Sequence, residues 1–328
     1  MSKSSTSADV FQSAIRVARA LAVCAAVTAA FGACERQAPA GSPDSTVAPL
    51  VADSTMPITP ELVASGWNVD AGPVVVLPTV EGGLSAGSLL RPEATELTVG
   101  DTSGLARALG DGMVELFARS GRVGTARLTI GAAPAVDSGC TAWPLARLAI
   151  DAGASTVPWT AAFAAGRVSA IALDSIEGLS PRDSARFAID LARLASGLPN
   201  DSMATFRGLP FVVLRAWRSR GLDTGFVVAT LARRVNQEDS PQEERLVLVI
   251  DQTGADSRKW TVAWHERASG REEELVVAEP LLAFRAGRSS DVHLLFGRDD
   301  GVALGAAVLT RDASGWRVQW ESAVAGCD

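Results

Sequence analysis

Near its end the chain reads DVHLLFGRDDGVALGAAVLTRDASGWRVQWES over residues 291–322. Apolar, strand-like runs alternate in this stretch with two turn sequences, Arg298-Asp299-Asp300-Gly301 and Asp312-Ala313-Ser314-Gly315. Clusters of Asp, Ser and Gly of this kind form turns, and connections this short join antiparallel strands. The stretch therefore predicts an antiparallel β-meander.

The same pattern extends back along the chain to Leu209. Eight strands are expected, at 210–217, 225–235, 244–251, 259–267, 273–285, 291–297, 302–311 and 315–322. We predict an α+β fold of mostly antiparallel β structure, with a meander-type sheet that forms a sandwich or an open barrel and carries one packed helix. This domain is expected to span residues 153–328, and a smaller β-rich block at 63–152 precedes it.

One helix is predicted just before the meander. Ser180 is a suitable N-cap, Pro181 follows at the first helical position, and Asp183 lies three residues after the cap. Apolar residues then recur on one face of the helix, at Phe187, Leu191, Leu194 and Leu198. We expect this face to pack on the sheet that follows, with Arg186 and Asp190 paired on the surface.

Two hairpins are expected ahead of the helix. The runs 113–118 and 123–130 alternate in polarity and flank a connection that contains glycine. The runs 159–164 and 168–173 are interpreted in the same way, as a second hairpin that leads into the helix.

Two of the later strands carry the same motif, Trp260-Thr261-Val262-Ala263-Trp264 and Trp316-Arg317-Val318-Gln319-Trp320. Because alternate residues of a strand share a face, the two Trp and the Val of each motif are expected on one side. We interpret them as core residues, since alternation of this kind is typical of a half-buried strand. A row of exposed Trp that binds carbohydrate is the alternative.

The beginning of the chain has a different character. Lys3, Arg16 and Arg19 precede an uncharged stretch from Ala20 to Ala33, which is shorter than the about 20 apolar residues that span a bilayer. The run at its end, Phe31-Gly32-Ala33-Cys34, resembles the lipobox of bacterial lipoprotein signals.

This resemblance implies that residues 1–33 are a signal peptide and that Cys34 carries lipid. The protein would then be anchored to a bacterial membrane of the cell envelope, facing the periplasm or the exterior. Cleavage of an ordinary signal after Ala30, which would leave a soluble periplasmic protein, is the alternative. Residues 34–62 are rich in Pro, Ser, Thr, Asp and Ala, and are expected to form a disordered tether.

The cysteine count depends on the same resemblance. With Cys34 assigned to lipid, the mature chain keeps Cys140 and Cys327 in an oxidising compartment, and we predict that they form a disulfide. Such a bond would contribute about 5 kcal/mol by the chain-entropy relation. Two free buried thiols are the alternative.

The mature chain is acidic. The first 33 residues hold three bases and one acid, so the 30 Lys and Arg and 37 Asp and Glu of the chain become 27 and 36, a net charge of −9. This charge argues against binding to nucleic acid. The expected partners are the membrane, through lipid on Cys34, and a protein or glycan ligand.

One motif is typical of catalysis. Gly83-Leu84-Ser85-Ala86-Gly87 fits G-x-S-x-G, but the run that follows contains Pro92 and does not resemble a helix start, so we interpret the motif as a Gly-rich loop. The two histidines, His265 and His293, are expected to be strand-surface residues, and neither metal nor cofactor is expected. We therefore predict a non-enzymatic binding or scaffold module. A secreted serine hydrolase that uses Ser85 with one of the histidines is the alternative.

Overall fold

The computed structural model describes the folded body of the protein. The described residues are 66–79, 83–92, 109, 111–131, 140–151, 157–199, 204–235, 241–253, 259–271, 274–299 and 303–326. They all belong to one compact unit. The predicted signal and tether, Cys34 and Cys327 lie outside these ranges.

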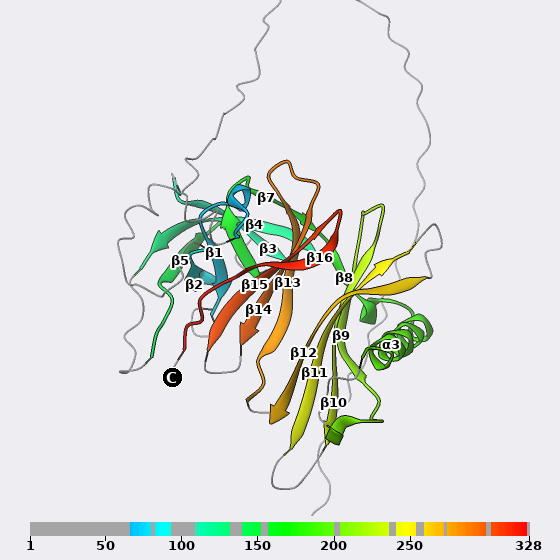
Figure 1. Ribbon diagram of the computed structural model, residues 1–328. Coiled ribbons are helices and arrows are strands. Elements are labelled where there is room, and N and C mark those ends of the chain that lie inside the picture. The colour runs from blue at the N-terminus through cyan, green and yellow to red at the C-terminus, as the bar shows by residue number, and fades with distance from the viewer. Residues whose placement is uncertain are drawn as a thin grey trace, which may run out of the picture. The chain divides into compact units, whose positions relative to one another are not determined.

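Six antiparallel strands form a closed barrel in the order β1-β2-β5-β4-β3-β6 (Figure 1). Their bounds are β1 (Val75–Pro78), β2 (Ala86–Leu90), β3 (Met113–Ala118), β4 (Gly121–Ile130), β5 (Leu145–Ile150) and β6 (Ala161–Ala164). The hairpin predicted at 113–130 is confirmed as β3 and β4. The hairpin predicted at 159–173 is wrong, because β6 pairs with β1 and β3 and closes the barrel. The barrel therefore takes its last strand from beyond residue 152.

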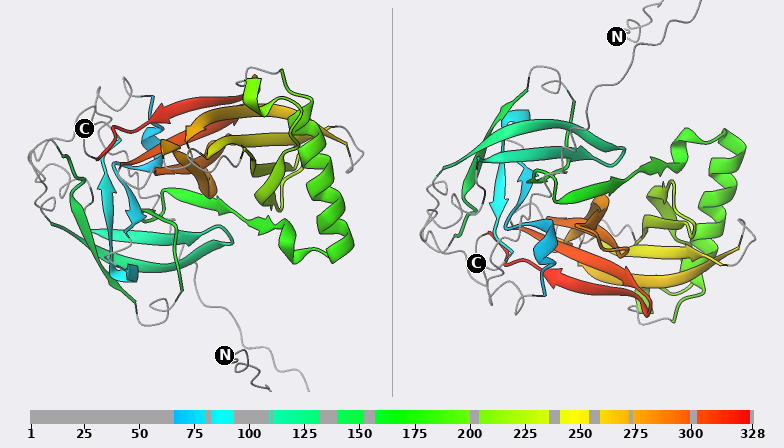
Figure 2. Two further views of the ribbon diagram at one scale, coloured as in Figure 1. Left: turned by 90° about the horizontal axis from the view of Figure 1, so that it is seen from below. Right: turned by 90° about the horizontal axis from the view of Figure 1, so that it is seen from above.

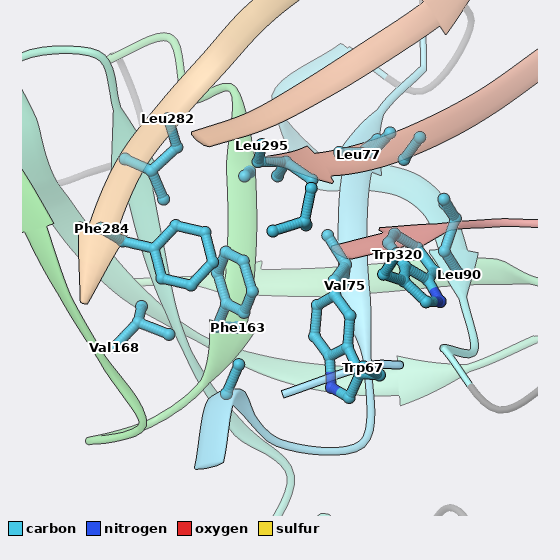
Figure 3. Close-up of a cluster of buried hydrophobic side chains, with 14 of the residues drawn as sticks. Trp67, Val75, Leu77, Leu90, Phe163, Val168, Leu282, Phe284, Leu295 and Trp320 are labelled. Atoms are coloured by element: carbon cyan, nitrogen blue, oxygen red, sulfur yellow. The ribbon is translucent and has the colours of Figure 1, made fainter. Parts of the chain in front are cut away.

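Strand β1 is buried on both of its faces. Val76 belongs to the cluster inside the barrel. Val75 and Leu77 belong instead to a cluster on the outside, together with Phe163 of β6 (Figure 3). A strand buried on both sides is expected to be apolar throughout, and this explains the uninterrupted run from Val74 to Leu77.

Ten further strands form two antiparallel five-stranded sheets. The first sheet has the order β12-β11-β10-β9-β8, and the second sheet has the order β16-β15-β14-β13-β7. The bounds are β7 (Val168–Ile171), β8 (Leu173–Ser175), β9 (Val212–Ser219), β10 (Phe226–Val235), β11 (Gln242–Gln252), β12 (Trp260–Arg271), β13 (Val277–Ala286), β14 (Val292–Asp299), β15 (Leu304–Asp312) and β16 (Gly315–Glu321). All eight strands predicted from residue 210 onwards are confirmed. The meander is divided, however, with β9–β12 in the first sheet and β13–β16 in the second.

The two sheets pack face to face, and each has its outer face covered. Phe226 and Val249 of the first sheet lie in one core with Leu294 and Phe296 of the second. Helix α3 (Pro181–Ser196) covers the outer face of the first sheet, and the barrel covers that of the second (Figure 2). The fold is thus mostly antiparallel β, with one α-helix within the described ranges.

Helix α3 begins as the sequence predicts. The Ser180 side chain accepts a hydrogen bond from the backbone N–H of Asp183, and Leu191 is buried against the first sheet. Asp190 pairs with Arg193 instead of the predicted Arg186, since residues three apart are also neighbours on a helix. Short 3-10 helices are η1 (Val69–Ala71), η2 (Gly83–Ser85), η3 (Ile176–Gly178) and η4 (Ala204–Phe206).

Bulges occur at corresponding places in the two meanders. In the first strand of each meander the register skips one residue, Leu214 in β9 and Leu281 in β13. In the fourth strand it skips Ala263 in β12 and Gln319 in β16. The two skipped residues of the fourth strands hold the same position in the repeated Trp motif.

These bulges divide each pair of Trp between two faces, because an extra residue reverses the alternation of side chains. Trp316 lies in the core between the sheets, and Trp320 lies in the cluster between the second sheet and the barrel. Trp260 packs against the helix side of the first sheet, and Trp264 against the core between the sheets. The prediction of one shared face is therefore wrong. The four indole rings belong to three hydrophobic clusters and form no continuous row.

Candidate functional site

The motif Gly83-Leu84-Ser85-Ala86-Gly87 lies at the barrel wall. Its first three residues form η2 and its last two begin β2, so Ser85 is an exposed residue that precedes a strand. A hydrolase nucleophile lies instead between a strand and a helix. At Gly87, an added Cβ would lie 2.4 Å from the carbonyl oxygen of Leu77 and 2.8 Å from Cγ1 of Val76. Close packing of β1 on β2 therefore accounts for the second glycine of the motif.

The two histidines lie on different sheets. His265 is exposed on β12, at the edge of the first sheet, as predicted. His293 on β14 is only 1% exposed, so the prediction of a surface position is wrong for this residue. Ser85 and the two histidines of the hydrolase alternative thus come from three separate sheets of the body.

His293 is covered by residues 66–72, which we call the lead segment. Trp67 of this segment is 4% exposed, and its ring meets the Trp320 ring edge to face with centroids 4.7 Å apart (Figure 3). Asn68 Nδ2 lies 3.3 Å from Nε2 of His293. One aromatic and one polar contact therefore join the lead segment to the second sheet.

The other side of His293 contacts its own sheet. Nδ1 lies 2.8 Å from Oγ1 of Thr310 on β15, and that hydroxyl donates to Oε1 of Gln319 on β16. The ring stacks on Phe284 of β13, with centroids 5.1 Å apart. Burial lowers the pKa of His293 because the charged ring would lose its hydration, and the charge of Asp291 offsets part of this effect. These surroundings favour a neutral imidazole.

The residues next to Cys140 and Cys327 in the sequence, Thr141 and Gly326, are hydrogen-bonded to each other. Cys140 precedes Thr141, whose backbone N–H donates to the carbonyl oxygen of Gly326 at 2.7 Å. The N–H of Gly326 donates to Oγ1 of Thr141 at 3.3 Å. The residue after Cys140 is thus bonded to the residue before Cys327. Cys327 itself and Cys34 lie outside the described residues, so the disulfide and the lipid site stay predictions.

A cavity of about 410 Å³ opens beside η3 and the adjoining strands β8 and β9. Its lining residues are Leu173, Asp174, Ser175, Ile176, Gly178, Leu179, Arg218 and Arg220. Arg220 donates two hydrogen bonds to Asp174 and holds the pKa of that carboxyl below its ordinary value. The charge of Arg218 also contributes to this lowering of the Asp174 pKa. Arg218 forms no ion pair within 4 Å among the residues that the structure describes, so its guanidinium can also contact a carboxylate or phosphate of a small ligand.

Sequence reasoning missed two clusters of charged side chains where β10 ends and β11 begins. In the ladder Arg233 pairs with Glu244, and Arg234 pairs with Glu243, so the two pairs face opposite sides of the sheet. The first cluster also contains Arg267, and the second also contains Arg245. Both carboxylates are almost fully buried. The sequence signal that could have predicted these clusters is a pair of adjacent Arg at the end of one strand and a pair of adjacent Glu at the start of the next.

Within the described ranges, no group of three or more His, Cys, Asp or Glu is placed to hold a metal ion. No helix in the described part of the chain is both long and apolar enough to cross a membrane. No protein-family model matches the sequence, and comparisons with curated proteins and with solved structures gave no match. Function is therefore inferred from the predicted signal, the fold and the site residues of this chain alone.

Proposed function

We propose that this protein is a lipoprotein of the bacterial cell envelope, anchored by lipid on Cys34, and that its folded body is a non-enzymatic binding or scaffold module. The observation that carries the proposal is the run Phe31-Gly32-Ala33-Cys34, and the lead segment, which packs on the body through Trp67, comes after the predicted tether of residues 34–62. Lipid, tether and body would then follow one another along the chain. The proposed partners are the membrane and a protein or glycan, and the cavity beside η3 offers a place for an acidic group.

Replacement of Cys34 by Ala tests the anchor. The wild-type protein is expected in the membrane fraction, and Cys34→Ala in the soluble fraction, because the variant lacks the acceptor of the lipid. Cys140→Ala is the matched control, since it also loses a cysteine but keeps the acceptor, and it should remain in the membrane fraction. Retention of Cys34→Ala in the membrane to the extent of this control would overturn the anchor.

A disulfide between Cys140 and Cys327 is part of the same proposal. It is supported by the two hydrogen bonds between Thr141 and Gly326, which bring the flanking backbones together. Mass spectrometry of the mature protein without reduction is expected to find one peptide pair joined through the two cysteines. Alkylation of both thiols before reduction would rule the bond out.

The alternative of a serine hydrolase rests on the motif Gly83-Leu84-Ser85-Ala86-Gly87, whose serine is exposed. A fluorophosphonate probe tests it directly, because the probe reacts with an activated serine. We expect no labelling of Ser85 under conditions in which a known serine hydrolase is labelled to completion. Labelling that is lost in Ser85→Ala but retained in Ser88→Ala would establish the hydrolase and overturn the non-enzymatic proposal.

A further inference from the structure

We propose that the lead segment is a pH-controlled clasp, which neutral His293 holds on the second sheet and which protonation of His293 loosens. The contact lies where the proposed tether joins the body. Its opening would add residues 66–72 to the proposed tether. At roughly 3.3 Å per residue, the tether would become longer by about 23 Å. The clasp does not depend on lipidation of Cys34.

The orientation of the Asn68 amide fixes the proton on His293. Oδ1 of Asn68 accepts a hydrogen bond from the backbone N–H of Asp70 at 3.0 Å, because Asn68 is the N-cap of η1. Its Nδ2 therefore faces Nε2 of His293. An amide nitrogen can only donate, so Nε2 must be an unprotonated acceptor.

The rest of the network agrees with this assignment. With Nε2 unprotonated, the ring proton lies on Nδ1 and is donated to Oγ1 of Thr310. The Thr310 hydroxyl is then free to donate to Oε1 of Gln319. The chain from Asn68 to Gln319 is complete only for the neutral ring, because a proton on Nε2 would face the hydrogens of the Asn68 amide.

The groups around His293 are mostly uncharged. Its stacking partner on β13 is Phe284, and β15 and β16 present the hydroxyl and the amide described above. Asp291 on the approach to β14 favours the charged ring, and burial opposes it more strongly. The lead segment contributes Asp70, whose backbone N–H donates to the N-cap side chain of Asn68. The added positive charge thus lacks a partner in direct contact.

Contacts other than that of His293 also hold the lead segment on the second sheet, so the proton on His293 changes the open fraction only gradually with pH. In the closed segment Trp67 is buried, and its ring packs on that of Trp320 in the second sheet. Gly66 has a positive φ of 77°, and an added Cβ would lie 2.5 Å from the carbonyl oxygen of Gln319. These contacts do not involve the ring of His293, so protonation of that ring shifts the opening equilibrium without abolishing the closed state. Since one proton is linked to the opening, the open fraction can rise by at most tenfold per pH unit.

Hydrogen exchange of the full-length protein measures the clasp. The N–H groups of Ala71 and Gly72 donate to the carbonyl oxygens of Asn68 and Val69 in the closed segment, so their protection reports its opening. Between pH 7.5 and 5, above the usual range of carboxyl titration, we expect the opening constant to rise as the pH falls. A flat profile in the wild-type protein would overturn the proposal.

Variants of the two histidines separate this effect from general acid sensitivity. His293→Gln keeps an amide in place of the ring and should remove the pH slope, whereas His265→Gln, on the exposed edge of the first sheet, should retain it. Asn68→Asp is the sharper test, because a carboxylate accepts from the protonated ring and still caps η1. In that variant the clasp should tighten as the pH falls. An unchanged slope in both His293→Gln and Asn68→Asp would refute the role of His293.

Discussion

The buried carboxylate of Glu244 gives a quantitative test of the packing at the end of β10 and β11. Glu244 is 0% exposed, accepts from Nε of Arg233, and has Oε1 3.7 Å from Nη1 of Arg267. Arg233 is held in place, since its guanidinium lies 4.6 Å from the centre of the Phe211 ring. Glu244→Gln would remove the buried negative charge that the buried Arg233 and the half-buried Arg267 both face. We expect a loss of about 3 to 5 kcal/mol.

Thermal unfolding followed by circular dichroism measures this loss. For a body of this size each kcal/mol lowers the Tm by roughly 2 to 4 °C, so Glu244→Gln should lower it by about 6 to 20 °C. Glu321→Gln is the matched control, because Glu321 also pairs with an arginine, Arg298, but its side chain is 52% exposed. Such a pair is worth at most about 1 kcal/mol. Equal melting temperatures of the two variants would refute the reasoning.

Gly87→Ala should lower the free energy of unfolding by about 1 to 3 kcal/mol, because the new Cβ would overlap a backbone oxygen, whereas Gly178→Ala, which meets nothing within 4 Å, should change it by less than about 0.5 kcal/mol. Leu191→Ala should cost about 2 to 5 kcal/mol, and Ile189→Ala, 68% exposed on the same helix, less than about 0.5 kcal/mol. Urea unfolding compares each pair, and equal midpoints would contradict the packing argument. Burial lowers the pKa of His293 below its ordinary value of 6.5. The neutral ring should therefore make its full contribution to the free energy of unfolding above about pH 6.5, and this contribution should be lost as the pH falls toward the folded-state pKa. Urea unfolding at pH 7.5 and 5 tests this, and greater stability at pH 5 would contradict it.

Strand and helix positions could be predicted because their signals are local. Alternation of side chains and the turns at Arg298–Gly301 and Asp312–Gly315 mark strand ends within a few residues of where the structure has them. The same is true of α3, whose N-cap at Ser180 and first residue Pro181 are both read from neighbouring positions. The predicted core position of the Trp motifs is confirmed for Trp316 and Trp320, whereas Trp260 and Trp264 are half-buried and Val318 is 40% exposed.

The assignment of strands to sheets could not be predicted in this way. The connection between β12 and β13 takes the chain from one sheet to the other. It is as short as a hairpin connection, and no sequence pattern distinguishes it from one. A bulge at Ala263 or Gln319 depends on the register of the partner strand, and one skipped residue is enough to move a Trp to the opposite face. Closure of the barrel by β6 depends on β1, far away in the chain.

The environment of His293 is the clearest example of a site that local patterns conceal. Val292 and Leu294 flank it in alternation, and such a histidine normally faces solvent at the surface of a sheet. Its burial depends on Asn68 and the rest of the lead segment, which are separated from it by 225 positions in the sequence. Patterns within one strand cannot report such a contact.

The double burial of β1 determines how the body can come apart. Val76 packs inside the barrel while Val75 and Leu77 pack against the second sheet, so one strand supports two cores. Neither core can lose this strand without exposing the other to water, and the two are therefore coupled into a single cooperative unit. A chain cut at residue 152 would also lack β6 and would leave β1 and β3 with open edges. The barrel is thus a part of the whole body and not an autonomous folding unit.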